Sequence, residues 1–334
     1  MQELRDHYNE VLMQSWVKRF RDIFDSDNYH PVQVNTPVEY DEIVDTIPYS
    51  DTQLEEVPFP KCFPFSAMVP RVYSEVKDFI LSCVKFSEDL NLSPAEIDET
   101  VRKSTNILLT RTLSGCLSSL IRRDNLSLLQ LIQIDINTYH LEETNIHLEK
   151  YISDITGTNY DSNHIGTIFL SPFFSRLLIF HFECVSARLQ GGSSFKDIRS
   201  EAEEEIHNKL ESKIDEFIEL ANYDWLMSEA QGTSSTWLMD LIAFLTSVFK
   251  QFTNLPVKLA QRTCMSACQH LARSIMEMLM DENIKAVSLG VLQQIDLDLC
   301  QCEQFAASEP IKGCRMYLFF SNFLFCIMPY QIFS

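Results

Sequence analysis

Glycine and proline are scarce in this sequence, with 8 glycines and 12 prolines among 334 residues. Folds made of many short strands need frequent turns, and turns depend on these two residue types. A β-sandwich or β-barrel is therefore not expected. Leucine, isoleucine, glutamate and serine are abundant instead, and 46% of the residues are hydrophobic. This composition indicates a mostly helical chain that can bury a substantial core.

Positive charge is also scarce. The chain carries 27 lysines and arginines against 47 aspartates and glutamates, a net charge of −20. Such a field repels phosphate backbones, so we expect no nucleic-acid partner and no direct binding to an anionic membrane. The first ten residues, MQELRDHYNE, lack the basic and apolar regions of a secretory signal, which favours a cytoplasmic protein whose ten cysteines stay reduced.

Catalytic sequence patterns are missing as well. The chain has no glycine-rich phosphate loop, no G-x-S-x-G elbow and no H-E-x-x-H motif, and its eight histidines are scattered. We therefore expect no enzyme and no cofactor. His181, between Phe180 and Phe182, is interpreted as a packed histidine, with a catalytic base as the alternative.

A zinc site is the one metal centre that the sequence could suggest. The candidate ligands are Cys264, Cys268, His270, Cys300 and Cys302. On a helix, Cys264 and Cys268 share the apolar stripe of Leu271 and Ile275, whereas His270 points to nearly the opposite side, and Cys300 and Cys302 diverge for the same reason. We therefore interpret the cysteines as buried thiols and expect no metal.

Helix-start signals divide the chain. Ser93, Pro94 and Glu96 match the N-cap, first and third positions of a helix. Asp124 is predicted to cap the next helix, and the glycine pair at 191–192 to end one. The predicted helices span 66–90, 94–122, 125–155, 163–190, 195–229, 234–252, 256–281 and 285–307.

The sequence also predicts a division into segments. Apolar residues recur at helical spacing over the first 27 residues, from Leu4 through Val11 and Trp16 to Phe24. Residues 28–64 are acidic and contain proline, and we expect them to form a mobile linker. The remaining segments are a first helical bundle at 65–192, a second at 193–313 and an apolar tail at 314–334. Long antiparallel helices packed in bundles are expected, so the fold class is all-α.

A run of acids at Glu201, Glu203, Glu204 and Glu205 is predicted to open a helix, where negative charge is favourable. A solvated helix face is the simplest interpretation, and a docking site for a basic partner is the alternative.

Four stretches of the sequence resemble one protein family. They are SDNYHPVQV (26–34), PFPKCFPFSAMVPRVY (58–73), YDWLMSEAQG (223–232) and QQIDLDLCQCEQFAASEP (293–310). Together they are similar to the C-terminal half of the Sec-fifteen subunit of the exocyst, over about residues 1 to 313. The likeness runs through linkers as well as helices, which makes it specific.

The resemblance implies a vesicle-tethering subunit built as an elongated rod of antiparallel helical bundles. Its expected partners are other exocyst subunits and the GTP-bound form of a recycling-endosome Rab GTPase, the latter bound by the second bundle. The expected location is peripheral, at recycling endosomes, vesicles and the plasma membrane. A generic helical scaffold of another tethering or coat assembly, without Rab binding, is the alternative.

The chain departs from the family at both ends. Members carry a further N-terminal helical region, so this chain resembles a fragment or a short form. After Gly313 the sequence no longer matches, and Met316 to Phe333 forms an uncharged, mostly apolar run. This length is near the lower limit for a membrane span, but its interrupting polar residues and Pro329 favour a poorly ordered end over a tail anchor.

One predicted helix supplies the candidate Rab-binding residues. From Ile284 to Ala306, the expected buried stripe is Ile284, Ser288, Val291, Ile295, Leu299, Cys302 and Ala306. On the opposite face Leu297 lies among uncharged polar side chains and beside two carboxylates. A lone exposed leucine, or one covered by a neighbouring helix, is the alternative. The residues proposed to contact the Rab are Gln293, Asp296, Leu297, Asp298 and Gln301.

Overall fold

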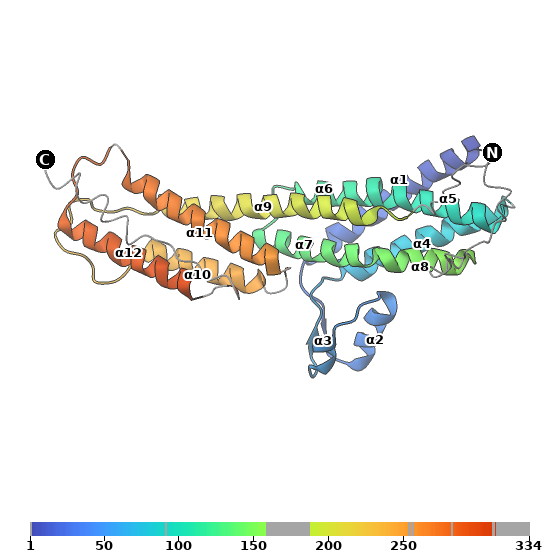
Figure 1. Cartoon of the computed structure of the whole chain (residues 1–334), viewed down its shortest axis with the longest axis horizontal. Helices are drawn as coiled ribbons and strands as arrows, with labels where there is room; N and C mark the ends of the chain where they lie inside the picture. Colours follow the sequence, from blue (N-terminus) through green and yellow to red (C-terminus); the bar gives the residue numbers. More distant parts are fainter. Residues whose placement is uncertain are drawn as a thin grey trace, which may run out of the picture. The chain divides into compact units, whose positions relative to one another are not determined.

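The structure, a computed structural model, describes residues 2–90, 92–157, 188–252, 255, 257–281, 283–308 and 311. Figure 1 shows the helices and strands, which in chain order are α1 (Gln2–Ser26), β1 (Gln33–Val34), α2 (Pro37–Thr46), α3 (Thr52–Glu56), β2 (Lys61–Cys62), α4 (Met68–Asp89), α5 (Pro94–Ile107), the π-helical η1 (Leu108–Leu113), α6 (Ser114–Ile121), α7 (Leu128–Glu143), α8 (Asn145–Thr156), α9 (Gly191–Glu219), α10 (Thr236–Gln251), α11 (Val257–Leu279) and α12 (Leu289–Ala307). The prediction of an all-α fold is confirmed. Within the described residues the β-structure is one short antiparallel pair, in which Val34 faces Lys61, and none of the helices has both the length and the apolar character that a membrane crossing requires.

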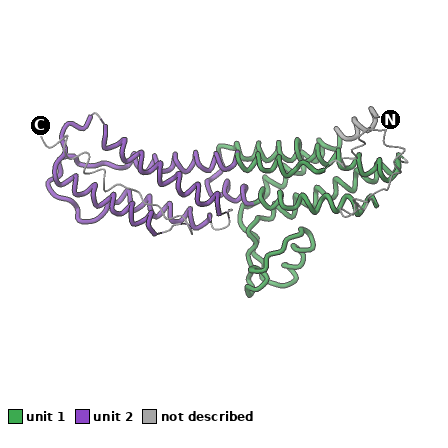
Figure 2. Tube along the Cα trace, in the orientation of Figure 1, with its two compact units in different colours: residues 1–124, 137–200 green, residues 125–136, 201–334 purple. Residues whose placement is uncertain are grey.

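The chain divides into two compact units (Figure 2). Unit 1 comprises residues 1–124 and 137–200, and unit 2 comprises residues 125–136 and 201–334. The sequence placed a bundle boundary after residue 192, whereas the units change at residue 200, inside α9. Residues 125–136 belong to the second unit, which a linear division of the chain did not anticipate.

Aromatic side chains join α1 to α4 in unit 1. Trp16 is buried, its ring meets that of Phe79 edge to face at 5.3 Å, and its Nε1 donates a hydrogen bond to the Glu75 carbonyl at 2.9 Å. Phe20 and Phe24 are also buried. The predicted apolar stripe of the first helix is therefore correct from Trp16 onward, but Val11 is 54% exposed.

The predicted cap of α5 is confirmed. The Ser93 side chain accepts a hydrogen bond from the Glu96 amide, and the Glu96 carboxylate accepts one from the Ser93 amide, which is a complete capping box. Asp124, by contrast, is not the cap of α7. Ser127 and Gln130 fill that role with the same reciprocal bonds, because α7 begins later than predicted, at Leu128.

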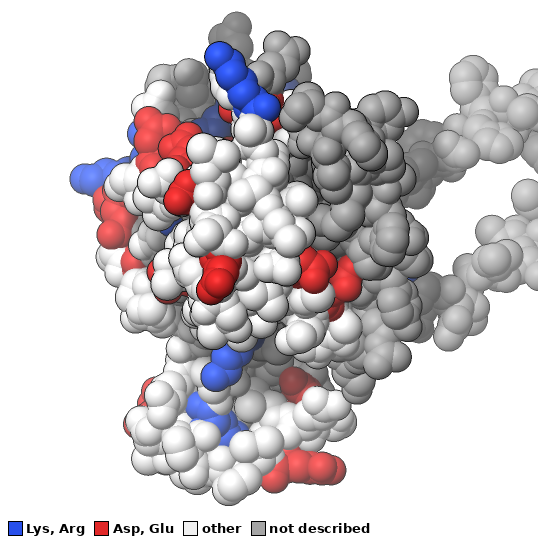
Figure 3. Space-filling view, turned by 90° about the vertical axis from the view of Figure 1, so that its left-hand side faces the viewer, with Lys and Arg blue, Asp and Glu red and all other residues white. Residues whose placement is uncertain are grey.

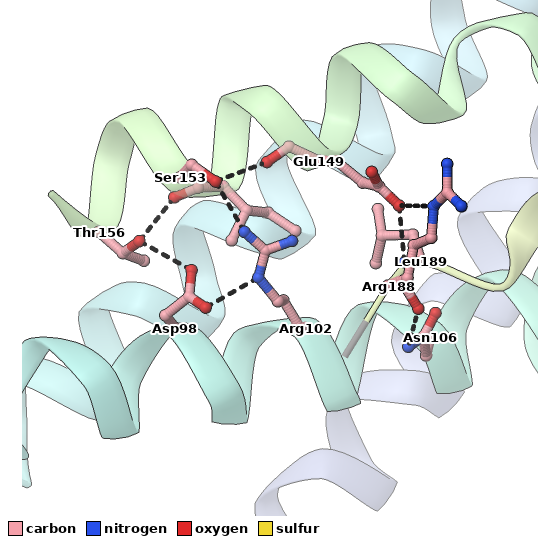
Figure 4. A network of polar contacts seen from close by, with 9 residues as sticks. Asp98, Arg102, Asn106, Glu149, Ser153, Thr156, Arg188 and Leu189 are labelled. Carbon is pink, nitrogen blue, oxygen red and sulfur yellow. Dashed lines mark hydrogen bonds and ion pairs between the residues drawn. The ribbon is translucent and has the colours of Figure 1, made fainter. Parts of the chain in front are cut away.

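A buried ion pair links α5 to α8 (Figure 4). Arg102 Nε lies 2.8 Å from Asp98 Oδ2 one helical turn away, and both side chains are 5% exposed. Across the interface, Thr156 Oγ1 donates to Asp98 Oδ1 at 3.0 Å, and Arg102 donates to Ser153 Oγ at 2.7 Å. Protein partners therefore satisfy both charges, as a buried pair requires.

The start of α9 is held by the same two helices (Figure 4). Glu149 accepts a hydrogen bond from the Leu189 amide at 2.8 Å, and Asn106 donates one to the Arg188 carbonyl at 3.3 Å. Asn106 also accepts one from the Gln190 amide at 2.7 Å. Gly191 begins α9 and does not end a helix as predicted. A Cβ there would lie 2.8 Å from Asn145 Oδ1, so a larger residue would require the Asn145 side chain to shift. Most of the predicted helix 163–190, including His181, lies outside the described residues.

The segment 28–64 is folded, and the prediction of a mobile linker is wrong. It forms α2, α3 and the β1–β2 pair, and Val34, Ile47 and Phe63 are buried. Phe65 packs against both Phe63 and Tyr49. The acids are compatible with this order because they point outward or cap helices, so they cost little while the aromatic residues supply the core.

Lys61 is enclosed within this segment. Its side chain donates hydrogen bonds to the carbonyls of Leu54 and Glu55, each at 2.9 Å. The ammonium also lies 4.9 Å from the ring centre of Tyr40 and 5.1 Å from that of Phe59. The cation thereby fixes the end of α3 against the aromatic residues.

A second buried polar network joins three distant parts of unit 1. Ser66 Oγ donates to Asp27 Oδ2 at 2.7 Å and accepts from Asn137 Nδ2 at 2.8 Å. The Ser66 amide donates to Asn137 Oδ1 at 2.9 Å. All three residues are buried, so the end of α1, the start of α4 and the middle of α7 are mutually positioned by hydrogen bonds that water does not compete for.

His140 packs half-buried among aromatic rings, and its titration is expected to make unit 1 acid-sensitive. The ring centres of Phe65 and Tyr49 lie 5.1 and 5.6 Å from that of His140. Burial lowers the pKa of His140 from 6.5 to about 4. The folded state therefore binds fewer protons than the unfolded state between these values. Stability is lost as pH falls through this window, by about 2 kcal/mol at pH 5 and about 3 kcal/mol at pH 4.

The check is urea unfolding at pH 7.5 and pH 5 of the wild type and His140→Phe, which keeps an aromatic ring that cannot titrate. The wild type should lose about 2 kcal/mol more than the variant on acidification. Identical pH dependence in the two proteins would show that His140 does not carry the effect.

In unit 2, α9 and α11 run in the same direction and are joined by a series of polar side-chain contacts. His207 Nε2 lies 2.9 Å from Thr263 Oγ1, and His270 Nε2 lies 2.7 Å from Asp215 Oδ1. The acidic run is in the interior of α9 and does not open it as predicted, because the helix already begins at Gly191; Glu203 pairs with Arg262 of α11.

Candidate functional site

Helix α12 carries the predicted interaction residues, and it begins later than predicted. Ser288 is the N-cap, its side chain accepting from the Val291 amide at 3.3 Å, so Ile284 lies in the preceding connection. Both Ile284 and Ser288 are half-buried. The rest of the predicted stripe is confirmed, since these residues are buried: Val291, Ile295, Leu299, Cys302 and Ala306.

The α9–α10 connection, residues 220–235, is bonded to α12 along most of its length. The Ser288 amide donates to the Trp225 carbonyl at 2.9 Å, and Ser288 Oγ donates to the Met227 carbonyl at 2.5 Å. Gln294 donates to the Thr233 carbonyl at 2.8 Å and accepts from the Gln231 amide at 2.9 Å. We call residues 220–235 the clasp. It covers one side of α12 and ends the preceding helix at Glu219, ten residues before the predicted end at 229.

Gly290 is what allows the clasp to approach α12. A Cβ at this position would lie 2.4 Å from the Met227 carbonyl oxygen and 2.7 Å from the Glu229 nitrogen. Both contacts are with backbone, which cannot rotate away. A side chain here would therefore push the clasp off the helix.

Asp298 is buried under the clasp, which corrects the prediction of a surface carboxylate. It is 3% exposed and accepts hydrogen bonds from the Tyr223 hydroxyl at 2.5 Å and from the Ser235 amide and hydroxyl at 2.6 Å each. Burial and the Asp298 charge raise the pKa of Tyr223 above its ordinary value, so the phenol stays protonated as a donor. Three donors compensate the loss of water around the carboxylate.

The other predicted site residues remain at or near the surface. Gln293 and Asp296 are exposed, while Leu297 and Gln301 are half-buried. Gln293 and Asp296 continue a line that starts at Leu289, since spacings of four and seven residues share one helix face. Leu289 is 67% exposed. We call this the outer face of α12.

Leu289 is an interaction candidate that the sequence did not single out. Leu226 of the clasp is 69% exposed, and its neighbour Trp225 is bonded to Ser288, the residue before Leu289. The end of unit 2 that holds these connections is largely uncharged, with both acidic and basic side chains around it (Figure 3). The sequence does contain a signal for this residue. Leu289 directly follows the N-cap Ser288 and does not belong to the buried stripe of α12.

His270 and Cys300 do not join the buried cysteines. Cys264 contacts Cys268, and Cys302 is buried near Cys268, whereas Cys300 is exposed and His270 contacts Asp215. In the part of the chain that the structure describes, no three histidine, cysteine or acidic side chains are grouped so that they could hold a metal ion.

Comparison with known proteins places this arrangement in context. Residues 1–322 match the family model described as exocyst complex subunit Sec15 C-terminal. The match continues past Gly313, where the resemblance seen in the sequence had ended. The tail from residue 314 lies outside the described residues.

Relatives and a solved structure agree with the family match. The chain is 49% identical to human exocyst complex component 6 over 311 residues, which are 93% of this chain and 36% of that protein. It is 41% identical to the Drosophila melanogaster protein of the same name over 94% of this chain and 38% of the relative. It thus spans little more than a third of these relatives. The crystal structure of the Sec15 C-terminal domain superimposes with a TM-score of 0.71 at 36% identity, covering 98% of this chain and 97% of that one.

Proposed function

The chain belongs to the family of exocyst complex subunit Sec15 C-terminal domains, and from this we propose that it serves as a non-enzymatic tethering part of an exocyst subunit. The observation that carries the proposal is the match over residues 1–322, which spans both units. Other exocyst subunits are the proposed partners, with recycling endosomes, vesicles and the plasma membrane as the proposed locations. Co-purification with the remaining subunits tests this assembly, and a chain that co-purifies with none of them would contradict it.

We further propose that the outer face of α12 binds the GTP form of a recycling-endosome Rab GTPase. Support comes from the exposed Gln293 and Asp296, the half-buried Leu297 and Gln301, and the exposed Leu289. An apolar anchor within a polar rim suits a protein interface. Asp298 supports the face from inside through the clasp and does not contact the partner. A helical scaffold without Rab binding is the rival proposal.

Leu297→Arg should weaken GTP-dependent Rab binding by about 2 kcal/mol or more, because a charged side chain replaces the apolar anchor. Calorimetry against the GTP-analogue and GDP forms of the Rab measures the effect. Asp296→Asn tests whether the carboxylate tunes affinity. Val257→Arg is the matched control, since Val257 is a 64% exposed apolar residue of the same unit at the start of α11.

Circular dichroism must show that each variant folds. Equal affinity of Leu297→Arg and Val257→Arg would place the Rab surface elsewhere. Absence of any nucleotide-dependent binding by the unmodified chain would favour the scaffold function.

A further inference from the structure

Helices α2 and α3 carry carboxylates that the described part of unit 1 leaves unneutralised. Two of the seven acids have local roles: Glu39 accepts from the Asn35 amide at 2.7 Å, and Asp51 caps α3. The other five are exposed, and their carboxylates make no hydrogen bond or ion pair with described residues: Asp41, Glu42, Asp45, Glu55 and Glu56.

Three of these acids share a helix face with an exposed apolar residue. On α2, Asp41, Glu42 and Asp45 lie three, four and seven residues after Val38, which is 66% exposed. The opposite side of this helix is directed inward, where Tyr40 stacks on Phe63 at 5.3 Å. The outward side of α2 is therefore an apolar residue bordered by three free carboxylates.

The carboxylates of α3 lie near this face. The ring of Phe59, just after α3, meets that of Tyr40 on α2 edge to face at 6.4 Å. Burial and the charges of Glu55, Asp51 and Asp41 raise the pKa of Tyr40, as expected if acids of both helices lie near this side chain. Val57 and Phe59, which follow α3, are 47% and 36% exposed.

The one lysine of this segment does not neutralise the surface. Lys61 is 7% exposed, and its ammonium is bonded to two carbonyls and enclosed by the rings of Tyr40 and Phe59. Arginine and further lysine are absent between residues 28 and 64. The field outside α2 and α3 is therefore set by the acids.

We propose that this acidic face, made of Val38, Asp41, Glu42, Asp45, Glu55, Glu56, Val57 and Phe59, docks a lysine- and arginine-rich amphipathic segment of a partner protein. The partner's cations pair with the carboxylates, and its apolar side chains cover Val38 and Phe59. Charge complementarity selects this occupant. A second copy of the chain, with a net charge of −20, would be repelled. The site is separate from α12 and does not depend on Rab binding.

The test uses the whole chain and a fluorescent synthetic helical peptide with lysine on one face and leucine on the other. The triple variant Asp41→Asn, Glu42→Gln, Asp45→Asn should weaken its binding about tenfold or more. The control triple Glu88→Gln, Glu204→Gln, Asp240→Asn removes three exposed carboxylates elsewhere and should change affinity less than about twofold. Val38→Ser should weaken binding without changing charge.

Hydrogen exchange should show peptide-induced protection confined to residues 37–59, and circular dichroism should show that both triples fold. Equal weakening by the two triples would mean that only the net charge matters and would overturn the proposal. So would absence of peptide binding, or sedimentation showing that the face instead mediates self-association.

Discussion

Replacing Arg102 with methionine is expected to lower the free energy of unfolding by about 3–5 kcal/mol, because the change leaves Asp98 charged and buried without its partner. The matched control is Lys103→Met on the same helix. Lys103 pairs with Glu99 at the same four-residue spacing, but these side chains are 65% and 62% exposed. That pair should contribute at most about 0.5 kcal/mol.

Urea unfolding followed by circular dichroism measures both variants. The double variant Asp98→Leu, Arg102→Met should recover much of the loss, since an apolar pair of similar volume avoids burying any charge. If Arg102→Met and Lys103→Met cost the same, the buried pair is not the link between α5 and α8 that its geometry indicates.

Asp298→Ala should cost about 3 kcal/mol and release the clasp. The alanine leaves the Tyr223 hydroxyl and the Ser235 amide and hydroxyl without their acceptor in a buried setting. Asp296→Ala, two residues away on the exposed side, should change stability by less than about 0.5 kcal/mol.

Two measurements report on the clasp directly. Limited proteolysis should cut residues 220–235 faster in Asp298→Ala than in Asp296→Ala, and the fluorescence of Trp225 should shift toward that of a solvated indole. Unchanged protection of this segment in a folded Asp298→Ala protein would show that Gln294 and Ser288 hold it without the carboxylate.

Periodicity and capping predicted most of the helices, and the failures have physical causes. Ser93 was found because a capping box is local. Asp298 was predicted to be on the surface because it was grouped with its neighbour Leu297. It follows Ile295 by three residues and precedes Cys302 by four, and this spacing places it on the buried stripe. The prediction for segment 28–64 was wrong because composition does not tell whether an acidic side chain points outward or inward. Phe65 packs on Phe63 and on His140 of α7, a contact between residues far apart in the sequence.

The sequence identified the two stretches that form the candidate site, but not the contact between them. The stretches 223–232 and 293–310 stood out separately, and the structure shows that they bond to each other, Tyr223 to Asp298 and Gln231 to Gln294. No local rule connects positions that far apart. Gly290 is informative for the same reason, since its requirement comes from the backbone of Met227, Ser228 and Glu229 in the clasp.

The network of Asp27, Ser66 and Asn137 has a consequence for how the protein is made. Ser66 and Asn137 are 71 residues apart, so α1 and α4 emerge from the ribosome well before the side chain that completes their junction. At roughly 5–20 residues per second, this interval lasts on the order of 4–14 s. During that time the apolar faces of the two helices and the polar groups of Ser66 that bond Asn137 are unprotected. Chaperone occupancy of the nascent chain should therefore persist until α7 has been synthesised.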